Sequence, residues 1–334
     1  MLDLNKIEQI ARGVDEHLRK LETMIGLLRD IRHSLDEIRH SREDAYMYEI
    51  GRLRMTVADL TEQLGKRGLP KTNQYEQELA EIRRLIDGPD WPAATDPASI
   101  CDGDEAKMRQ RASLIIDLLV GEHMKGKRFL DYGCGHGHVV MAAKDRETAT
   151  SVGYDIDLSK LSFSGPDFTD DFNVVKSMAP FDIVVLHDVL DHAVGMEPIG
   201  ILYQIKSVLS PKGRVYVRCH PWSSRHGGHL YTSANKAFLH LSLDAVELVR
   251  VGGLVCETTV RVTSPLETYR CWFTEAGFRV CSAIPIRDPV EEFFLMPSVA
   301  RDRIVKNFPD LQTAKENMEI TFVEYVLEPD SQVF

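Results

Sequence analysis

The stretch KRFLDYGCGHGHVV, residues 127–140, decides how this chain folds. A short apolar strand leads into glycines at alternate positions, Gly133, Gly135 and Gly137, and an apolar segment typical of a helix start follows. Glycine lets the backbone turn tightly and approach a ligand closely because it has no Cβ, and a helix start offers free N–H groups and the positive end of its dipole. A dinucleotide fingerprint would need its third glycine where His138 stands. The spacing therefore favours a nucleoside ligand without a pyrophosphate.

A second segment, SVGYDID at residues 151–157, is typical of the next strand and carries acidic residues at its end. An acidic side chain at the tip of a second strand, about 20 residues beyond a glycine loop, can accept hydrogen bonds from both hydroxyls of a ribose. We therefore predict that Asp155 binds a ribose, with a plain turn or capping role as the alternative. Asp157 is better placed to cap the short helix that follows.

The region continues with alternating strands and helices. FDIVVLHDVLDH, residues 181–192, opens with a continuous apolar run typical of a central parallel strand that is buried on both faces. A helix is predicted over 198–209 and a strand over 214–219, and a later helix ends at Gly277 before another strand. This alternation predicts an α/β fold with a mostly parallel sheet and helices on both faces.

Taken in this order, the segments resemble class I S-adenosylmethionine-dependent methyltransferases over about residues 105–330. The match is carried by residues 131–137, 153–155 and 181–192, with LSPKG at 209–213 and EAGF at 275–278. The resemblance implies a Rossmann-like, seven-stranded, mostly parallel sheet with S-adenosyl-L-methionine at the carboxyl edge of its strands. The loop would contact the methionine moiety, the second strand would hold the ribose, and the fourth would close the pocket behind the sulfonium. The implied cofactor-binding residues are Asp131, Gly133, Gly135, Gly137, Asp155, His187 and Asp188.

One stretch departs from the family pattern. Only about 26 residues separate Asp155 from Phe181, where family members usually carry a full helix, a third strand and a contact to adenine. Asp170, Asp171 and Phe172 are the candidates for that contact, and the sequence does not rank them.

An insertion at about residues 221–268 follows the fifth strand, at an edge where related proteins commonly build the acceptor site. Three histidines, His220, His226 and His229, stand within ten residues at its start. In one interpretation His220 or His229 is a catalytic general base with a pKa near the ordinary value of about 6.5. A metal site is the second, although the spacing matches no standard zinc motif and no metal ligand is assigned; a polar loop with structural histidines is the third. His192 is expected to shape the pocket wall or to cap a helix rather than to transfer protons.

The first 88 residues follow a different pattern. Apolar residues recur every seven positions in two series three residues apart, the a and d positions of a heptad repeat. Two glycines and a proline within residues 65–70 end this helix, and a shorter helix follows. A long helix cannot bury such a stripe against itself, so residues 1–88 are predicted to form a homo-oligomeric coiled coil, with an intramolecular hairpin as the alternative. Residues 89–104 are predicted to be a linker and 105–334 the α/β domain. The heptad residues are Ile7, Val14, Leu21, Leu28 and Leu35 at a, and Ile10, Met24, Ile31 and Ile38 at d, with His17 at one d position.

Composition narrows the class of protein. The chain has 334 residues and a formal net charge of -11, which disfavours nucleic acid as a partner. No apolar run reaches the roughly 20 residues that span a bilayer. The N-terminus lacks the basic and apolar regions of a secretory signal, so a cytoplasmic location or incorporation in a larger assembly is expected. The six scattered cysteines form no C-x-x-C pair, which argues against a four-cysteine zinc site.

Two functions remain. The first is methyl transfer to a small molecule, glycan or protein by an oligomer tethered through its coiled coil. The alternative is a structural or assembly protein, for example a viral particle component, whose methyltransferase-like domain docks a partner with little or no activity. An intact glycine loop and Asp155 favour the first, and the glycine spacing disfavours a nicotinamide oxidoreductase.

Overall fold

The structure, a computed structural model, describes residues 73–97, 100, 103–121, 123–193, 198–258 and 260–330. Residues 72–334 form one compact unit. The heptad region lies outside the described residues, so the coiled coil stays a prediction. Over the described part of the chain, no helix combines the length and hydropathy needed to cross a membrane.

The elements alternate largely as the sequence predicts. In chain order they are α3 (Asn73–Asp87), α4 (Glu105–Leu114), η2 (Ile115–Val120), β1 (Arg128–Tyr132), α5 (His138–Lys144), β2 (Thr150–Tyr154), η3 (Leu158–Lys160), β3 (Phe168–Thr169), α6 (Phe172–Ser177), β4 (Phe181–His187), α7 (Pro198–Val208), β5 (Leu209–Cys219), α8 (Leu239–Ser242), α9 (Ala245–Gly252), α10 (Pro265–Glu275), β6 (Phe278–Arg287), α11 (Glu291–Leu295), α12 (Ser298–Val305), α13 (Leu311–Met318) and β7 (Ile320–Pro329).

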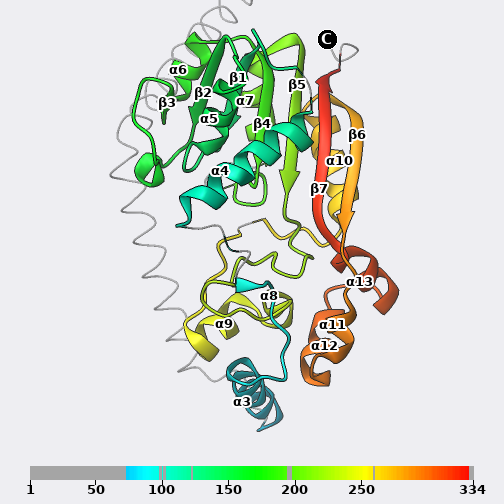
Figure 1. The fold of residues 1–334 in the computed structure, drawn as a ribbon. Coiled ribbons are helices and arrows are strands. Elements are labelled where there is room, and N and C mark those ends of the chain that lie inside the picture. The colour runs from blue at the N-terminus through cyan, green and yellow to red at the C-terminus, as the bar shows by residue number, and fades with distance from the viewer. Residues whose placement is uncertain are drawn as a thin grey trace, which may run out of the picture. The chain divides into compact units, whose positions relative to one another are not determined.

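All of these strands join one seven-stranded sheet in the order β3-β2-β1-β4-β5-β7-β6 (Figure 1). Strands β1 to β5 pair in parallel, whereas β7 runs antiparallel to both β5 and β6. The predicted α/β fold and its seven-stranded sheet are confirmed, and the sheet is mixed because of β7. The strand order reverses between β1 and β4, and α/β sheets bind ligands at the carboxyl ends of strands at such a point.

Alternate strand residues enter two apolar layers, one on each face of the sheet. Leu130 and Val184 belong to the cluster covered by α6, α7 and α10, whereas Phe129 and Ile183 belong to the cluster under α5 and η2. All four side chains are fully buried. Successive strand residues point to opposite faces, so a continuous apolar run fills both layers at once.

The short segment between β2 and β4 explains the departure seen in the sequence. The third strand, β3, has two residues, and α6 has six. Among the adenine candidates, Asp171 caps α6 by accepting a hydrogen bond from Asn173 N at 2.8 Å. Phe172 packs its ring 5.5 Å from that of Tyr154, and Asp170 is exposed. A strand of two residues leaves no periodic pattern to detect.

Apart from the two layers on the sheet there is a separate apolar cluster, named the second cluster below. It lies away from the sheet and gathers α3, α8, α9, α11, α12 and α13 (Figure 1). The insertion at 221–268 supplies α8 and α9, while its last residues begin α10, which packs on the sheet. A further insertion, residues 288–319 between β6 and β7, supplies α11, α12 and α13 and was not predicted from the sequence. The two insertions therefore build one layer together.

The segment before α4 also packs into this layer. Trp91 is 1% exposed and its Nε1 donates to Ala237 O at 2.8 Å. The side-chain Oδ1 of Asn235 accepts from Ala94 N and Thr95 N at 3.0 Å each. The predicted domain boundary at residue 88 stays a prediction, but the described residues on both sides of it are tied to the insertion.

Candidate functional site

The glycine loop after β1 is closed onto β2 by backbone hydrogen bonds. The N–H groups of Gly133 and Cys134 both donate to Tyr154 O, at 2.7 and 3.0 Å. Gly133, Gly135 and Gly137 have φ values of 82°, 48° and 83°, which L side chains rarely adopt. A Cβ built on Gly135 would meet no atom within 4 Å, so this part of the loop faces open space.

Asp155 at the end of β2 is joined to that loop. Its Oδ2 accepts a hydrogen bond from Gly135 N at 2.8 Å, and its Oδ1 accepts one from Asp157 N at 3.1 Å. The side chain therefore points toward the glycine loop, which is where a carboxylate that binds the ribose of a ligand is expected to lie. Asp157 caps η3 by accepting from Ser159 N at 2.9 Å, as the sequence predicted.

Asp131 is the fourth of the five residues of β1 and is 2% exposed. Burial, with a smaller contribution from the negative charge of Asp155, raises the pKa of its carboxyl to about 8. The group is therefore protonated at neutral pH. A cationic ligand beside it would favour the ionised form.

These residues border a cavity of about 210 Å³ at the switch point of the sheet. Six of the seven predicted cofactor-binding residues line it, whereas Asp155 reaches it through its hydrogen bond to Gly135. Helix α4 and η2 contribute a wall that the sequence analysis missed, because no local pattern links them to the loop. The predicted residues that line the cavity are Asp131, Gly133, Gly135, Gly137, His187 and Asp188. The wall from α4 and η2 includes Met108, Arg111 and Ile115.

Asp188 is held at the far side of the cavity in a left-handed conformation with φ 56°. Its Oδ2 accepts from Arg111 Nη2 at 2.9 Å and lies 3.2 Å from His187 Nδ1. Burial alone would raise the pKa of Asp188, but electrostatic interactions with His187, His220 and Arg111 and the hydrogen bond with His187 hold it well below the ordinary value. Asp188 is therefore an ionised, fixed wall of the cavity at neutral pH.

The histidines of the insertion gather behind Asp188. His220 and His229 are 7% and 9% exposed, and the Nδ1 of His220 donates to Thr321 O at 3.1 Å. The ring centroids of His220 and His226 are 4.5 Å apart, and those of His192 and His229 are 4.6 Å apart. Burial lowers the pKa of His220 well below its usual range and that of His229 to about 4. The pKa values of both histidines therefore lie below the expected value of about 6.5. They are lowered because the loop is buried, in part by residues of β7 such as Thr321.

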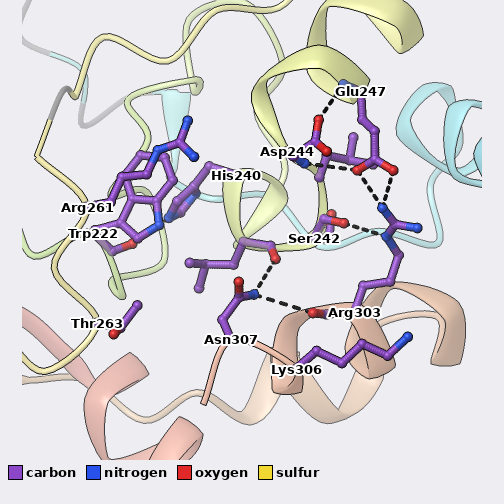
Figure 2. Close-up of a pocket in the computed structure, with 12 residues that line it drawn as sticks. Trp222, His240, Ser242, Asp244, Glu247, Arg261, Thr263, Arg303, Lys306 and Asn307 are labelled. Carbon is purple, nitrogen blue, oxygen red and sulfur yellow. Dashed lines mark hydrogen bonds and ion pairs between the residues drawn. The ribbon is translucent and has the colours of Figure 1, made fainter. Parts of the chain in front are cut away.

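A larger cavity of about 430 Å³ lies in the second cluster and shares no lining residue with the first (Figure 2). Its polar atoms already hold the helices together. Arg303 pairs with the Glu247 carboxylate and donates through Nε to Ser242 O at 2.7 Å, and Asn307 Nδ2 donates to Leu241 O at 2.7 Å. None of the predicted site residues lies there, so we assign the chemistry to the smaller cavity.

Comparison with known families decides the class of protein. A family model described as a methyltransferase domain matches residues 105–283, more than half of the chain. The chain belongs to this methyltransferase family. The predictions of a methyltransferase and of S-adenosyl-L-methionine as its cofactor are confirmed.

Individual relatives of the methyltransferase are distant. The ribosomal RNA small subunit methyltransferase G of Glaesserella parasuis serovar 5 (strain SH0165) is 30% identical over 81 residues, which cover 24% of this chain and 37% of that relative. A SAM-dependent methyltransferase structure from Archaeoglobus fulgidus is 14% identical with a TM-score of 0.41, over 66% of this chain and 93% of that one. An S-adenosylmethionine-dependent methyltransferase from Mesorhizobium loti is 14% identical with a TM-score of 0.39, over 66% and 99%.

Proposed function

We propose that this methyltransferase binds S-adenosyl-L-methionine across the tips of β1 and β2 and transfers its methyl group to an acceptor beside the insertion. The observation that supports this most is the 2.8 Å hydrogen bond from Gly135 N to Asp155 Oδ2. It joins the loop proposed for the methionine end to the carboxylate proposed for the ribose. The loop lines the cavity of about 210 Å³, and Asp155 reaches the cavity through this hydrogen bond.

The residues present fit a cationic nucleoside. S-adenosyl-L-methionine supplies a methyl group on a sulfonium whose positive charge disappears during transfer. An enzyme for this displacement mainly aligns the reacting groups, since effective molarities from alignment can reach about 10⁵–10⁸ M. In this chain the glycine loop offers a close backbone approach, and the ionised Asp188 is fixed by Arg111 and His187 at the opposite wall.

His220 and His229 are the proposed catalytic groups on the acceptor side. Both are neutral imidazoles at neutral pH because burial lowers their pKa values. The electrostatic coupling of each to Asp188 supports their placement next to the cofactor cavity. The proposed acceptor is a small molecule, a glycan or a protein, because the formal charge of -11 disfavours a polyanion.

Titration calorimetry of the full chain with S-adenosyl-L-homocysteine and S-adenosyl-L-methionine tests cofactor binding. We expect saturable binding of both, and a loss of at least about tenfold in affinity in Asp155→Ala, since two ribose hydrogen bonds at about 1 kcal/mol each are removed. The matched control is Asp145→Ala, which removes an exposed carboxylate from the other end of α5. Equal affinities in the two variants would contradict the ribose assignment.

Absence of binding to either nucleoside would contradict the proposed function. Methyl transfer itself requires release of S-adenosyl-L-homocysteine in the presence of an acceptor. His229→Gln is expected to slow that release while leaving the affinity for S-adenosyl-L-homocysteine unchanged.

We further propose that the heptad region within the predicted segment 1–88 assembles the methyltransferase into a homo-oligomer. The support is the heptad series from Ile7 to Ile38. Its apolar stripe cannot be buried against the helix that carries it and needs a partner surface. An oligomer would place several cofactor sites on one particle. The mass of the full chain in solution tests this proposal.

A further inference from the structure

One group of ion-ligating side chains stands beside the methyltransferase cavity without a role in cofactor binding. Among the described residues, Asp191, His192 and His229 bring one ligand atom each to within 4.8 Å of one another. Asp191 and His192 follow β4, and His229 comes from the histidine-rich start of the insertion. From the sequence, no metal ligand is predicted here, because the histidine spacing alone offers no carboxylate. The fold supplies that carboxylate from a distant segment.

Asp191 is the first sign that this cluster is a ligand site. Its side chain is 0% exposed, and neither Oδ1 nor Oδ2 has a hydrogen-bond partner among the described residues. Burying a polar group without a partner is costly, and buried carboxylates in proteins are paired, hydrogen-bonded or bound to metal ions. Two unsatisfied oxygens on one fully buried carboxylate therefore point to a missing partner.

The two histidines offer ring nitrogens to the same place. Nε2 of His229 is buried and has no partner among the described residues, and the residue is held at a left-handed φ of 52°. His192 Nδ1 donates to Glu257 O at 3.3 Å, which leaves the Nε2 lone pair free, 3.7 Å from Asp191 Oδ2. A hydrogen bond on the other ring nitrogen is how metal-ligating histidines are usually oriented.

The spacing of the cluster fits an ion. In a tetrahedral site with bonds of about 2 Å, ligand atoms lie roughly 3.3 Å apart. The 3.7 Å between Asp191 Oδ2 and His192 Nε2 is close to this value. We propose that Asp191, His192 and His229 bind a divalent first-row transition-metal ion. Two imidazoles and one carboxylate suit zinc, iron or manganese, whereas calcium and magnesium prefer sites made of oxygen alone.

The proposed site keeps an open position. Three protein ligands with a fourth place for water or substrate is the arrangement of catalytic rather than structural zinc sites. Asp188, whose Oδ1 is also buried without a partner among the described residues, lines the cofactor cavity and interacts electrostatically with both Asp191 and His229. An acceptor oxygen at the open position would lie beside the transferred methyl group. That consequence rests on the proposed function, whereas ion binding does not.

Cobalt(II) is the probe, because its visible absorption reports nitrogen and oxygen ligands directly. The untagged full chain is stripped with a chelator, dialysed and titrated with Co²⁺. We expect saturation at one ion per chain, with loss of the absorption when Zn²⁺ is added. Asp191→Asn and His192→Gln should each weaken the affinity at least about tenfold, and His123→Gln, which changes an exposed histidine, should leave it unchanged.

The His192→Gln variant distinguishes the loss of a metal ligand from misfolding. Its side chain is 29% exposed, so His192→Gln should fold even if Asp191→Asn does not, and circular dichroism checks both. No absorption change on adding Co²⁺, or an affinity in His192→Gln equal to that of wild type, would overturn the metal site. Titration with S-adenosyl-L-homocysteine on the same samples separates the two proposals: Co²⁺ binding without nucleoside binding would count against methyl transfer alone.

Discussion

Asp131 shows how a single residue couples the cofactor cavity to the stability of the fold. Burial, with help from Asp155, raises the pKa of its carboxyl to about 8, whereas in an unfolded chain an aspartate titrates near 3.9. Between these values the folded chain binds one more proton than the unfolded chain. The stability linked to this group is therefore complete below about pH 4 and is lost as the pH rises through about 8.

Asp131→Asn should remove this dependence on pH. We expect the free energy of unfolding of wild type, measured relative to the variant by urea titration, to fall between about pH 5 and about pH 8. One group can contribute a slope of at most about 1.4 kcal/mol per pH unit. Asp145→Asn, at an exposed carboxylate, serves as the control. A difference between wild type and Asp131→Asn that stays constant with pH would contradict a buried, protonated carboxyl.

The residues that the sequence predicted are those whose partners are near in the chain or fixed by the strand order. The loop glycines and Asp155 meet because β1 and β2 are parallel neighbours. Arg111 was missed because its contact with Asp188 spans 77 positions and depends on how α4 crosses the sheet. The grouping of Asp191 with His229 was missed for the same reason.

Among the elements, α9 and α12 are joined by a buried ion pair. Glu247 closes a capping box with Asp244 at the start of α9 and also pairs with Arg303 on α12. The two side chains are 4% and 18% exposed, so water screens the pair weakly. Figure 2 shows both reaching across the same gap between the helices. This pair links the two insertions to each other.

Arg303→Met should destabilise the chain by about 3–5 kcal/mol, because it leaves the Glu247 carboxylate buried without its cation. Glu247→Gln in the same chain should restore part of the loss, since it removes the uncompensated charge. Urea unfolding of wild type, both single variants and the double variant measures the coupling. Effects that simply add would mean that the pair contributes no interaction of its own.

Elements were predictable where the pattern was long enough. The helix at α7 was predicted within one residue of its observed bounds, and the apolar run at 183–186 lies inside β4. Strand β5 begins at Leu209, five residues before the predicted start at 214. Helices α11, α12 and α13 have five, eight and eight residues, too few for a helical period to stand out against neighbouring loops. Their burial is decided by the other insertion, which no local pattern reveals.

At the scale of the whole molecule, the compact unit that carries the cofactor cavity begins at Thr72, directly before α3. Helix α3 packs in the second cluster with α9 and α12. The heptad pattern ends before the glycines at 65–70. A coiled coil would therefore join the compact unit through a segment of only a few residues, and substitutions in the heptads change no residue that lines the cofactor cavity.

Leu21→Asp combined with Leu28→Asp should abolish self-association, because two charges enter the a positions of the predicted seam. Light scattering on the full chain should give a multiple of 37.8 kDa for wild type and 37.8 kDa for this variant. Arg12→Gln combined with Arg19→Gln changes the net charge equally at outward heptad positions and should leave the mass of wild type unchanged. The affinity for S-adenosyl-L-homocysteine should be the same in all three proteins. A wild-type mass of 37.8 kDa would contradict the coiled coil and favour the intramolecular hairpin, in which the apolar stripe is covered within one chain.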